Sequence, residues 1–599
     1  MAYQAKKRLS LLRQNMEEAG VDAYLIPTED FHNSEYVGDY FKCREYISGF
    51  TGSAGTLLVT MDRAWLWTDG RYFLQAEQQL AGSGIQLMRM GEPEVPQLMP
   101  FLIQMMKKGQ TLGFDGRTLN ARFAHLLARN FQSKKVKIRW DLDLVGDIWE
   151  ERPALSCEPL WALPLAQAGE TAENKITWLR EELRKQKTDI LVLSTLDDIA
   201  WLLNLRGHDV SCNPVFLSYL TLTQEEIRLY VQEQAIKPEI EAILENLGIT
   251  RRPYDAIYQD LQQVPDGQMI WMDGNRANYA ILKSIHSGVR VWDRPSPTVL
   301  RKAVKNPVEQ ENIRQAHIQD GVAVTKFMYW LKKNVEKSYI TEISAARHLE
   351  KLRQERPGYL EPSFDPILAY GPHGAIVHYS VTPETDVQLE PHSFLLADTG
   401  GHYLQGTTDI TRTIALGPVS DEQKACYTAV LRGNLNLGAA KFRQGCRGVN
   451  LDILAREPLW DLGMDFNHGT GHGVGYLLNV HEGPNAIRWK LSADRNQDPE
   501  FLPGMLTSNE PGVYLAGRYG VRLENLILCK KTEETDFGEF LEFETMTMVP
   551  FDLDAVDPEQ MSQRQKRLLN AYHHQVRENI APYLTPEERA WLYHATREI

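Results

Sequence analysis

The sequence predicts an α/β protein in which two related segments precede a larger third one. Two proline-rich stretches, 152–165 and 293–307, divide the chain. Such stretches commonly mark boundaries because proline continues neither a helix nor a central strand. We therefore expect domains at 1–160, 161–305 and 306–599, although each stretch could also be a surface loop inside one domain.

The composition is that of a soluble globular protein. The chain has 599 residues, 43% of them hydrophobic and 24% charged, which argues against disorder. Its net charge of −14 argues against a dedicated nucleic-acid binder. The N-terminus is charged throughout, no run approaches the roughly 20 apolar residues of a membrane span, and six cysteines are scattered without a C-x-x-C pair. We expect a cytoplasmic protein with reduced thiols.

The first two segments repeat one plan. Residues 8–30 and 175–197 each contain a helix-period run followed by a short apolar run that is typical of a buried strand. Four residues recur at a constant offset of 167: Leu12, Arg13, Asp22 and Asp30 correspond to Leu179, Arg180, Asp189 and Asp197. Chance could supply a few matches, but the constant offset favours a duplication of an α/β unit.

The third segment opens with a strong helix signal. Asn306 can cap the helix, Pro307 suits its first position, and Glu309 completes a capping box. Apolar residues then recur on one helical face. They are Ile313, Ala316, Ala323, Phe327 and Leu331.

Two aspartates flank a glycine-rich turn in this third segment. A strand-like run, Phe394–Ala397, ends on Asp398, and a second run, Asp409–Ile414, begins on Asp409. Paired strands would bring the two carboxylates together, where at ~4 Å and an effective dielectric near 20 they would repel by roughly 4 kcal/mol. A cation is the simplest remedy. The alternative is that each aspartate points into water from a loop or an edge.

Three histidines follow in a stretch of interleaved glycines. His468, His472 and His481 lie in NHGTGHGVGYLLNVHEGP, which contains five glycines. Neutral imidazole is a common metal ligand, and glycine allows close approach of the backbone. The stretch is not a dinucleotide-binding fingerprint, because Val474 occupies the place of the third required glycine. A lone histidine is usually structural, but three in fourteen residues indicate a site.

Two glutamates complete the candidate cluster. Glu510 precedes Pro511, which favours extended backbone. Val521–Leu528 is predicted to be a strand with Glu524 in its interior, on the same face as Arg522. A buried glutamate needs a partner, and Arg522 alone could supply it in a structural ion pair.

Together these residues make an oxygen-rich set with one imidazole and no thiolate. The set is Asp398, Asp409, His472, Glu510 and Glu524. It favours a divalent ion such as manganese over structural zinc. Four negative charges suit two divalent ions better than one.

The motifs TGGHYLQGTTDITRT, HGTGHGVG, VHEGP, NEPGVY and GVRLEN resemble the aminopeptidase P family of pita-bread metallopeptidases, which are related to prolidase, methionine aminopeptidase and creatinase. In the first two segments, SGFTGSAGTLLVT, WTDGRYFLQA and LDDIAWLLNLRGHDVSCNPVFLSY resemble its long, three-domain cytosolic form. The likeness covers the whole chain. It implies two creatinase-type N-terminal domains followed by a pita-bread catalytic domain.

The resemblance also implies roles for single residues. Asp398 would bind the first metal, Asp409 and Glu524 would bridge both ions, and His472 and Glu510 would complete the second. Glu510 would also be the general base. Groups expected to contact the peptide are Arg71, His378, His468, His472, His481 and Glu510. Arg522 would support the ligands. His573 and His574 match no motif and are interpreted as solvated helix residues.

The implied reaction is release of the N-terminal residue from peptides with proline in second place, through attack by a metal-bridging hydroxide. The X–Pro bond has no N–H, so proteases that align their substrate through that group lose a contact. The family also implies a homodimer. Two alternatives remain: a prolidase, which cleaves only Xaa-Pro dipeptides and typically has one such N-terminal domain, and a pita-bread protein that binds peptide without cleaving it.

Overall fold

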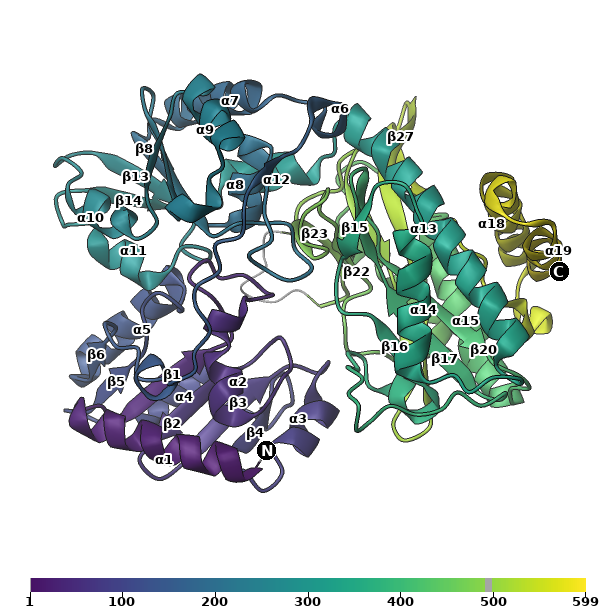
Figure 1. Cartoon of the computed structure of the whole chain (residues 1–599), viewed down its shortest axis with the longest axis horizontal. Coiled ribbons are helices and arrows are strands. Elements are labelled where there is room, and N and C mark those ends of the chain that lie inside the picture. The colour runs from purple at the N-terminus through teal and green to yellow at the C-terminus, as the bar shows by residue number, and fades with distance from the viewer. Residues whose placement is uncertain (1, 491–497) are drawn as a thin grey trace. The chain divides into compact units, whose positions relative to one another are not determined.

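The computed structural model describes residues 2–490 and 498–599. The chain divides into two compact units (Figure 1). The first comprises Met1–Pro164 and Glu170–Val299, and the second comprises Leu165–Gly169 and Leu300–Ile599. Within the described ranges, no helix combines the length and the apolar character that crossing a bilayer requires.

The first unit contains two six-stranded sheets of the same topology. One has the order β4-β3-β2-β1-β5-β6 and the other β12-β11-β10-β8-β13-β14. The strands of the first are β1 (Ala23–Pro27), β2 (Thr56–Thr60), β3 (Ala64–Thr68), β4 (Gln86–Arg89), β5 (Thr111–Gly113) and β6 (Lys137–Arg139). Those of the second are β8 (Ile190–Leu193), β10 (Ser218–Leu222), β11 (Ile227–Val231), β12 (Ile249–Pro253), β13 (Met269–Met272) and β14 (Arg290–Asp293).

The two sheets also agree in strand direction. β1 and β8 each pair antiparallel with one neighbour and parallel with the other. A helix precedes each of these strands, α1 (Ala2–Glu18) before β1 and α7 (Ala172–Gln186) before β8. Because strand order, direction and the preceding helix all match, the expected pair of related α/β domains is confirmed.

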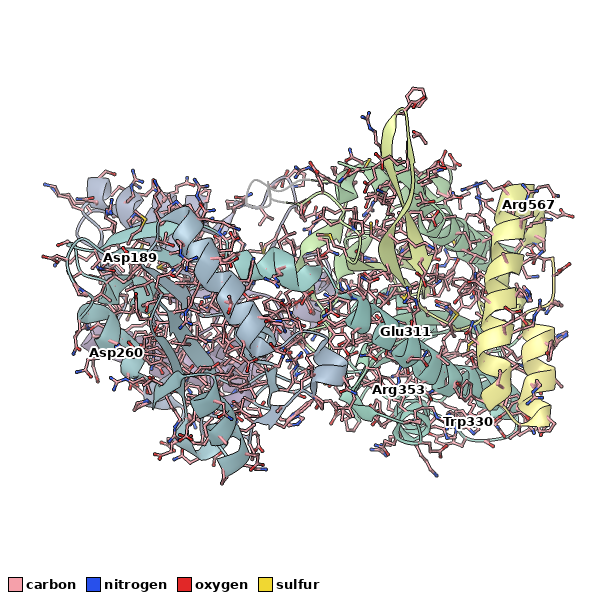
Figure 2. The ribbon with its side chains drawn as sticks, turned by 90° about the horizontal axis from the view of Figure 1, so that it is seen from above. Asp189, Asp260, Glu311, Trp330, Arg353 and Arg567 are labelled. Atoms are coloured by element: carbon pink, nitrogen blue, oxygen red, sulfur yellow. The ribbon has the colours of Figure 1, made fainter. Side chains whose placement is uncertain are left out.

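Contacts of the offset residues repeat as well. Asp22 precedes β1, and its Oδ2 accepts a hydrogen bond of 2.7 Å from the backbone N–H of Thr111. Asp189, labelled in Figure 2, precedes β8 and accepts the same bond, also at 2.7 Å, from the backbone N–H of Met269. Each aspartate thus ties the start of its central strand to the parallel neighbour. This shared function explains why an aspartate stands at both positions.

The second unit begins with the predicted long helix. α13 (Pro307–Asn334) has a complete capping box, in which Asn306 Oδ1 accepts from the backbone N–H groups of Val308 and Glu309, and the Glu309 carboxylate accepts from the N–H of Asn306. The predicted helix start is therefore confirmed. The five apolar residues predicted to share one face are all buried.

This helix and α14 (Glu342–Gln354) pack on a three-stranded sheet of order β16-β17-β20. Its strands are β16 (Ile367–Tyr370), β17 (Phe394–Thr399) and β20 (Ile410–Ala415). Phe327 and Leu331 of α13 and Leu349 of α14 share a buried core with Leu395 of β17 and Ile414 of β20. The sheet that carries the two aspartates is therefore packed against two helices.

A six-stranded sheet of order β21-β28-β27-β24-β22-β23 supplies the other candidate ligands. Its strands are β21 (Lys441–Arg443), β22 (Gly471–Gly473), β23 (Glu482–Ile487), β24 (Leu506–Asn509), β27 (Asn525–Thr535) and β28 (Gly538–Thr545). A short hairpin, β25 (Gly512–Leu515) with β26 (Tyr519–Arg522), lies between β24 and β27 in the sequence. The backbone N–H of Glu524 donates to the carbonyl of Thr411 at 3.0 Å, so the start of β27 meets β20.

One expectation about the C-terminal helices is wrong. His573 of α18 (Gln563–Ile580) is fully buried, and its Nε2 accepts a hydrogen bond of 3.1 Å from the backbone N–H of Phe551. Burial, reinforced by the nearby positive charge of Arg412, lowers the pKa of His573 to about 3. The adjacent His574 is exposed, as expected. Successive helical residues point in different directions, so the two histidines occupy opposite environments.

Candidate metal centre

The two aspartates lie on paired strands. Asp398 is the fifth residue of β17, and Asp409 directly precedes β20. The two strands pair antiparallel, with Asp398 opposite Thr411 and Thr399 opposite Ile410. Both carboxylates are buried. The sequence pattern of an aspartate at the end of one strand and another at the start of its partner therefore does bring the two side chains to one end of the sheet.

His472 and Glu510 come from the six-stranded sheet. His472 is the middle residue of β22, and Glu510 directly follows β24, which pairs with β22. His472 Nε2 lies 3.5 Å from Asp409 Oδ2 and 3.5 Å from Glu510 Oε1. His472 Nδ1 lies 2.9 Å from the carbonyl oxygen of Gly473. A carbonyl only accepts, so Nδ1 carries a proton, and Nε2 is the ring nitrogen that faces the carboxylates.

Glu524 reaches the same place, but not from the interior of a strand. The predicted strand Val521–Leu528 is wrong, because β26 ends at Arg522 and β27 begins at Asn525, and the two belong to different sheets. Glu524 occupies the break between them. Its Oε2 accepts a hydrogen bond of 2.7 Å from the hydroxyl of Thr411. Ligand atoms of Asp409, His472 and Glu524 all lie within 4.8 Å of one another, which is close enough to share a metal ion.

Burial and mutual repulsion raise the pKa values of three of these carboxylates. Burial raises the pKa of Asp409 well above its usual range, and the neighbouring charges of Glu524, Asp398 and Glu510 raise it further. Burial and then Glu524 raise the pKa of Glu510 in the same way, against the opposing charge of Arg522. Burial and Asp398 raise the pKa of Glu524 to about 7. Such a cluster stays ionised near neutral pH only if positive charge enters it.

Two buried oxygen atoms of this cluster fit a metal ion. Neither Oδ1 of Asp398 nor Oε1 of Glu524 has a hydrogen-bond partner among the residues that the structure describes. A buried carboxylate oxygen without a donor is costly. Hard divalent cations prefer carboxylate oxygens. The donor set and its unpartnered oxygens therefore suit one or more divalent cations.

Arg522 organises one side of the cluster. Its guanidinium donates to Asp398 Oδ2 at 2.5 Å, to the hydroxyl of Tyr514 at 2.7 Å, and to the carbonyl of Val377 at 3.3 Å. The ion pair is thus formed with Asp398 rather than with Glu524, so a structural pair with Arg522 does not account for Glu524. No role for Tyr514 follows from the sequence alone, although Tyr514 is the last residue of the NEPGVY motif.

Two of the other histidines border the cluster. His468 Nε2 lies 2.8 Å from the Tyr514 hydroxyl, and its Nδ1 lies 3.9 Å from Glu510 Oε2. The ring of His481 lies 4.3 Å from that of His472, nearly perpendicular to it. All three histidines of the glycine-rich stretch therefore gather in one place.

His378 and Arg71 are less directly placed. His378 is half-buried and follows Val377, the residue whose carbonyl accepts from Arg522. Arg71 belongs to the first unit, where it pairs with Asp69 at 2.9 Å and with Glu35 at 3.5 Å. Its expected contact with a peptide remains a prediction.

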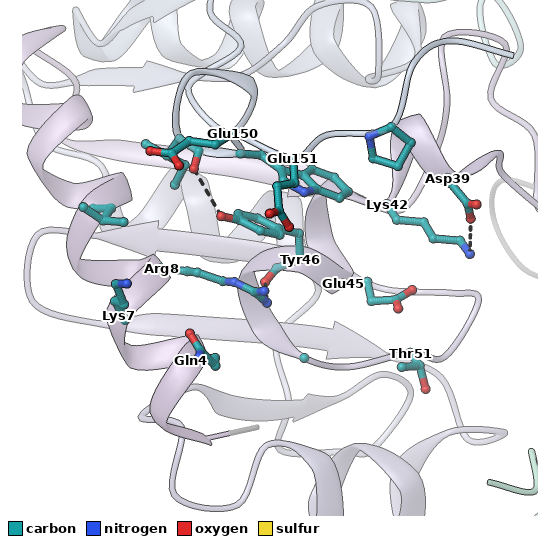
Figure 3. A pocket seen from close by; sticks show the side chains of 15 residues that line it. Gln4, Lys7, Arg8, Asp39, Lys42, Glu45, Tyr46, Thr51, Glu150 and Glu151 are labelled. Atoms are coloured by element: carbon teal, nitrogen blue, oxygen red, sulfur yellow. Dashed lines mark hydrogen bonds and ion pairs between the residues drawn. The ribbon is translucent and has the colours of Figure 1, made fainter. Parts of the chain in front are cut away.

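A separate cavity lies in the first unit. It has a volume of about 690 Å³, and Figure 3 shows the side chains that line it. Tyr46 stacks on Trp149, with ring centroids 4.5 Å apart, and the guanidinium of Arg8 covers the Tyr46 ring at 4.0 Å. The lining mixes both charge signs and includes none of the predicted site residues. It therefore contributes nothing to the metal centre.

Comparisons with known protein families match this architecture segment by segment. Residues 8–138 and 151–309 each match the Creatinase/Prolidase N-terminal domain. Residues 311–531 match metallopeptidase family M24, and 539–599 match the C-terminal region of peptidase_M24. The fold class is therefore two creatinase-type domains followed by a pita-bread domain, as expected, and the chain is a metallopeptidase of the hydrolase class.

Relatives that match over the whole chain show which family of metallopeptidases it belongs to. Aminopeptidase P1 of Arabidopsis thaliana is 36% identical over 99% of both chains, and a probable Xaa-Pro aminopeptidase P of Sordaria macrospora is 38% identical over 100% of both. The crystal structure of X-prolyl aminopeptidase from Caenorhabditis elegans, described as a cytosolic enzyme with a di-nuclear active site, is 32% identical and covers 99% of this chain and 100% of its own, with a TM-score of 0.94. The chain belongs to the aminopeptidase P family.

Proposed function

We propose that this protein is a metal-dependent Xaa-Pro aminopeptidase that releases the N-terminal residue from peptides with proline in second place. The observation that carries the proposal is the buried cluster of four carboxylates and His472, in which two carboxylate oxygens lack a partner among the described residues. The names of the full-length relatives support the substrate class.

The cluster would hold two divalent ions, with Mn²⁺ as the native metal. Asp398 would bind the first ion, Asp409 and Glu524 would contact both, and His472 and Glu510 would complete the second. When bound, the ions would lower the pKa of a water molecule and polarise the scissile carbonyl. The di-nuclear site named for the Caenorhabditis elegans enzyme supports this stoichiometry.

The protein's own groups would move the proton and hold the peptide. Glu510 is the general base of the proposal, because its carboxylate lies 3.5 Å from His472 at the proposed metal site, where a carboxylate can accept a proton from water. His378 and His481 would donate hydrogen bonds to the peptide and to the oxygen that gains negative charge. His468, held by Tyr514, would line the pocket. Arg71 would contact the peptide from the first unit.

We further propose domain boundaries at 1–160, 161–305 and 306–599, a homodimer, and a cytoplasmic location. The separate matches at 8–138, 151–309 and 311–531 support a division into three domains. The description of the Caenorhabditis elegans enzyme as cytosolic supports the location.

Incubation with the pentapeptide Arg-Pro-Pro-Gly-Phe, with the products analysed by mass spectrometry, tests the proposal. The expected first products are free arginine and Pro-Pro-Gly-Phe, which itself has proline in second place and can be shortened further. Arg-Ala-Pro-Gly-Phe is the matched control and should be cleaved far more slowly, because its second residue is not proline. Cleavage of Arg-Pro but not of the pentapeptide would make the protein a prolidase. Cleavage of neither by metal-loaded protein would favour a peptide-binding protein without catalysis.

A further inference from the structure

A buried ion pair lies between the two helices that pack on the aspartate-bearing sheet, and it takes no part in the proposed metal binding or peptide cleavage. It joins Asp320 of α13 to Arg353 of α14, the helices that pack on the aspartate-bearing sheet. Arg353 Nε donates to Asp320 Oδ1 at 2.7 Å, and its Nη2 donates to Oδ2 at 3.2 Å. Asp320 is fully buried and Arg353 is 2% exposed. Figure 2 labels Arg353 on its helix.

The pair is bonded to the residue next to each aspartate. Arg353 Nη2 also donates to the hydroxyl of Thr399 at 3.0 Å, and Thr399 directly follows Asp398. The hydroxyl of Thr408 donates to Asp320 Oδ2 at 2.6 Å, and Thr408 directly precedes Asp409. One ion pair therefore holds both ends of the connection between β17 and β20.

Stability alone does not explain such a pair. Removing two charges from water costs several kcal/mol for each ion, and well-packed apolar residues often do as well or better. Asp320 is not a ligand candidate, because its oxygens accept from Arg353, from Thr408 and, at 3.1 Å, from the hydroxyl of Tyr403. What the pair does provide is fixed geometry, and metal ligands must be held to within about 0.5 Å.

We infer that Asp320 and Arg353 are positioning residues for the metal centre, acting through Thr399 and Thr408 on Asp398 and Asp409. This inference rests on the proposed function. Supporting partners behind metal ligands are typically worth 10- to 100-fold in metal affinity. Loss of either threonine hydroxyl should therefore weaken metal binding without changing the ligands themselves.

The test uses the full chain, stripped of metal and titrated with Mn²⁺ in a calorimeter. Thr399→Val and Thr408→Val remove the hydroxyls at nearly constant shape, and Thr399→Ser and Thr408→Ser restore them. Thr428→Val is the matched control, because Thr428 is fully buried in the same unit and its hydroxyl accepts from the backbone N–H of Asp557. We expect the valine variants to bind Mn²⁺ about 10- to 100-fold more weakly, the serine variants to recover, and the control to bind like the unmodified protein.

Two outcomes would overturn the inference. Valine variants that bind Mn²⁺ as tightly as the unmodified protein would show that the pair does not position the ligands. An equal loss of Mn²⁺ affinity in Thr428→Val would show that the valine variants act by general destabilisation and not by moving the ligands. If the unmodified protein binds no Mn²⁺, the proposed function fails instead, so the two failures are distinguishable. Asp320→Asn should weaken binding further, and the threonine variants decide the matter even if that variant does not fold.

Discussion

Arg522 pairs with Asp398, with Nη2 and Oδ2 2.5 Å apart, and leaves the nearby Glu524 to the hydroxyl of Thr411. In each carboxylate one oxygen is hydrogen-bonded, whereas the other has no partner among the described residues. This division suits a carboxylate that is oriented by the protein through one oxygen and offers the other to a cation. Arg522 therefore orients the Asp398 carboxylate as well as neutralising part of its charge.

Replacing Arg522 with lysine tests that role. Lysine keeps the charge but cannot reach Asp398, Tyr514 and Val377 together, as the guanidinium does. We expect kcat/KM to fall about 10- to 100-fold. Arg518→Lys is the control, because Arg518 is an exposed residue of the same hairpin region that pairs with Glu422. Equal activities in the two variants would show that the three contacts do not matter.

Glu510→Gln tests the general base. The amide cannot accept the proton, so we expect kcat to fall by about 10² to 10⁴, the usual contribution of such a group. The metal-free protein should be at least as stable as before, because the change removes one of several mutually repelling carboxylates. Steady-state kinetics and chemical denaturation measure the two effects. Turnover close to that of the unmodified protein would exclude Glu510 from the role. The control is Glu422→Gln, at an exposed position of α15 (Asp421–Gly438).

Arg456 holds the loop that carries His468 through hydrogen bonds to its backbone. Arg456 of α17 (Ile453–Trp460) is 1% exposed and donates to Asp452 Oδ2 at 2.7 Å, to the carbonyl of Phe466 at 2.8 Å and to that of His468 at 2.9 Å. Lysine cannot make all three bonds. We expect Arg456→Lys to lose about 1.5 kcal/mol of substrate binding, a roughly tenfold rise in KM. Metal affinity should not change. A weaker affinity for Mn²⁺ with an unchanged KM would contradict this assignment.

His573 should make the protein sensitive to acid. Its pKa is about 3 in the folded state against an ordinary value of 6.5. Between these values the unfolded chain binds a proton that the folded chain excludes, so its contribution to stability is complete above about pH 6.5 and is lost as the pH falls towards 3. Denaturation at a series of pH values measures the slope. His573→Gln should flatten it, whereas His574→Gln, at an exposed position, should leave it unchanged; equal slopes in all three proteins would refute the prediction.

Much of the architecture could be read from the sequence because it depends on local patterns. The capping box at Asn306 and the aspartates that end and begin paired strands rest on signals a few residues long. Asp22 and Asp189 are recognised because one short pattern occurs twice, 167 residues apart. These signals survive folding because each is satisfied by backbone groups nearby or by an adjacent strand.

Other features depend on contacts that the sequence does not display. The break at Glu524 arises because β26 and β27 enter different sheets, and no glycine or proline in 521–528 marks it in the sequence. His573 is buried because it faces Phe551 rather than solvent. Asp320 did offer a signal, since it lies four residues after Ala316 and three before Ala323, on the apolar face of its helix. Its partner, Arg353, could not be identified without the packing of α13 against α14.

Peptide cleavage should depend on a two-ion centre formed by Asp398, Asp409, His472, Glu510 and Glu524. The most direct test strips the protein of metal, returns Mn²⁺ in steps, and measures bound metal and arginine release from Arg-Pro-Pro-Gly-Phe in the same samples. Activity should rise as about two ions bind to each chain, and Asp409→Asn should lose both metal and activity. Full arginine release by the metal-free protein, or by Asp409→Asn, would contradict the claim.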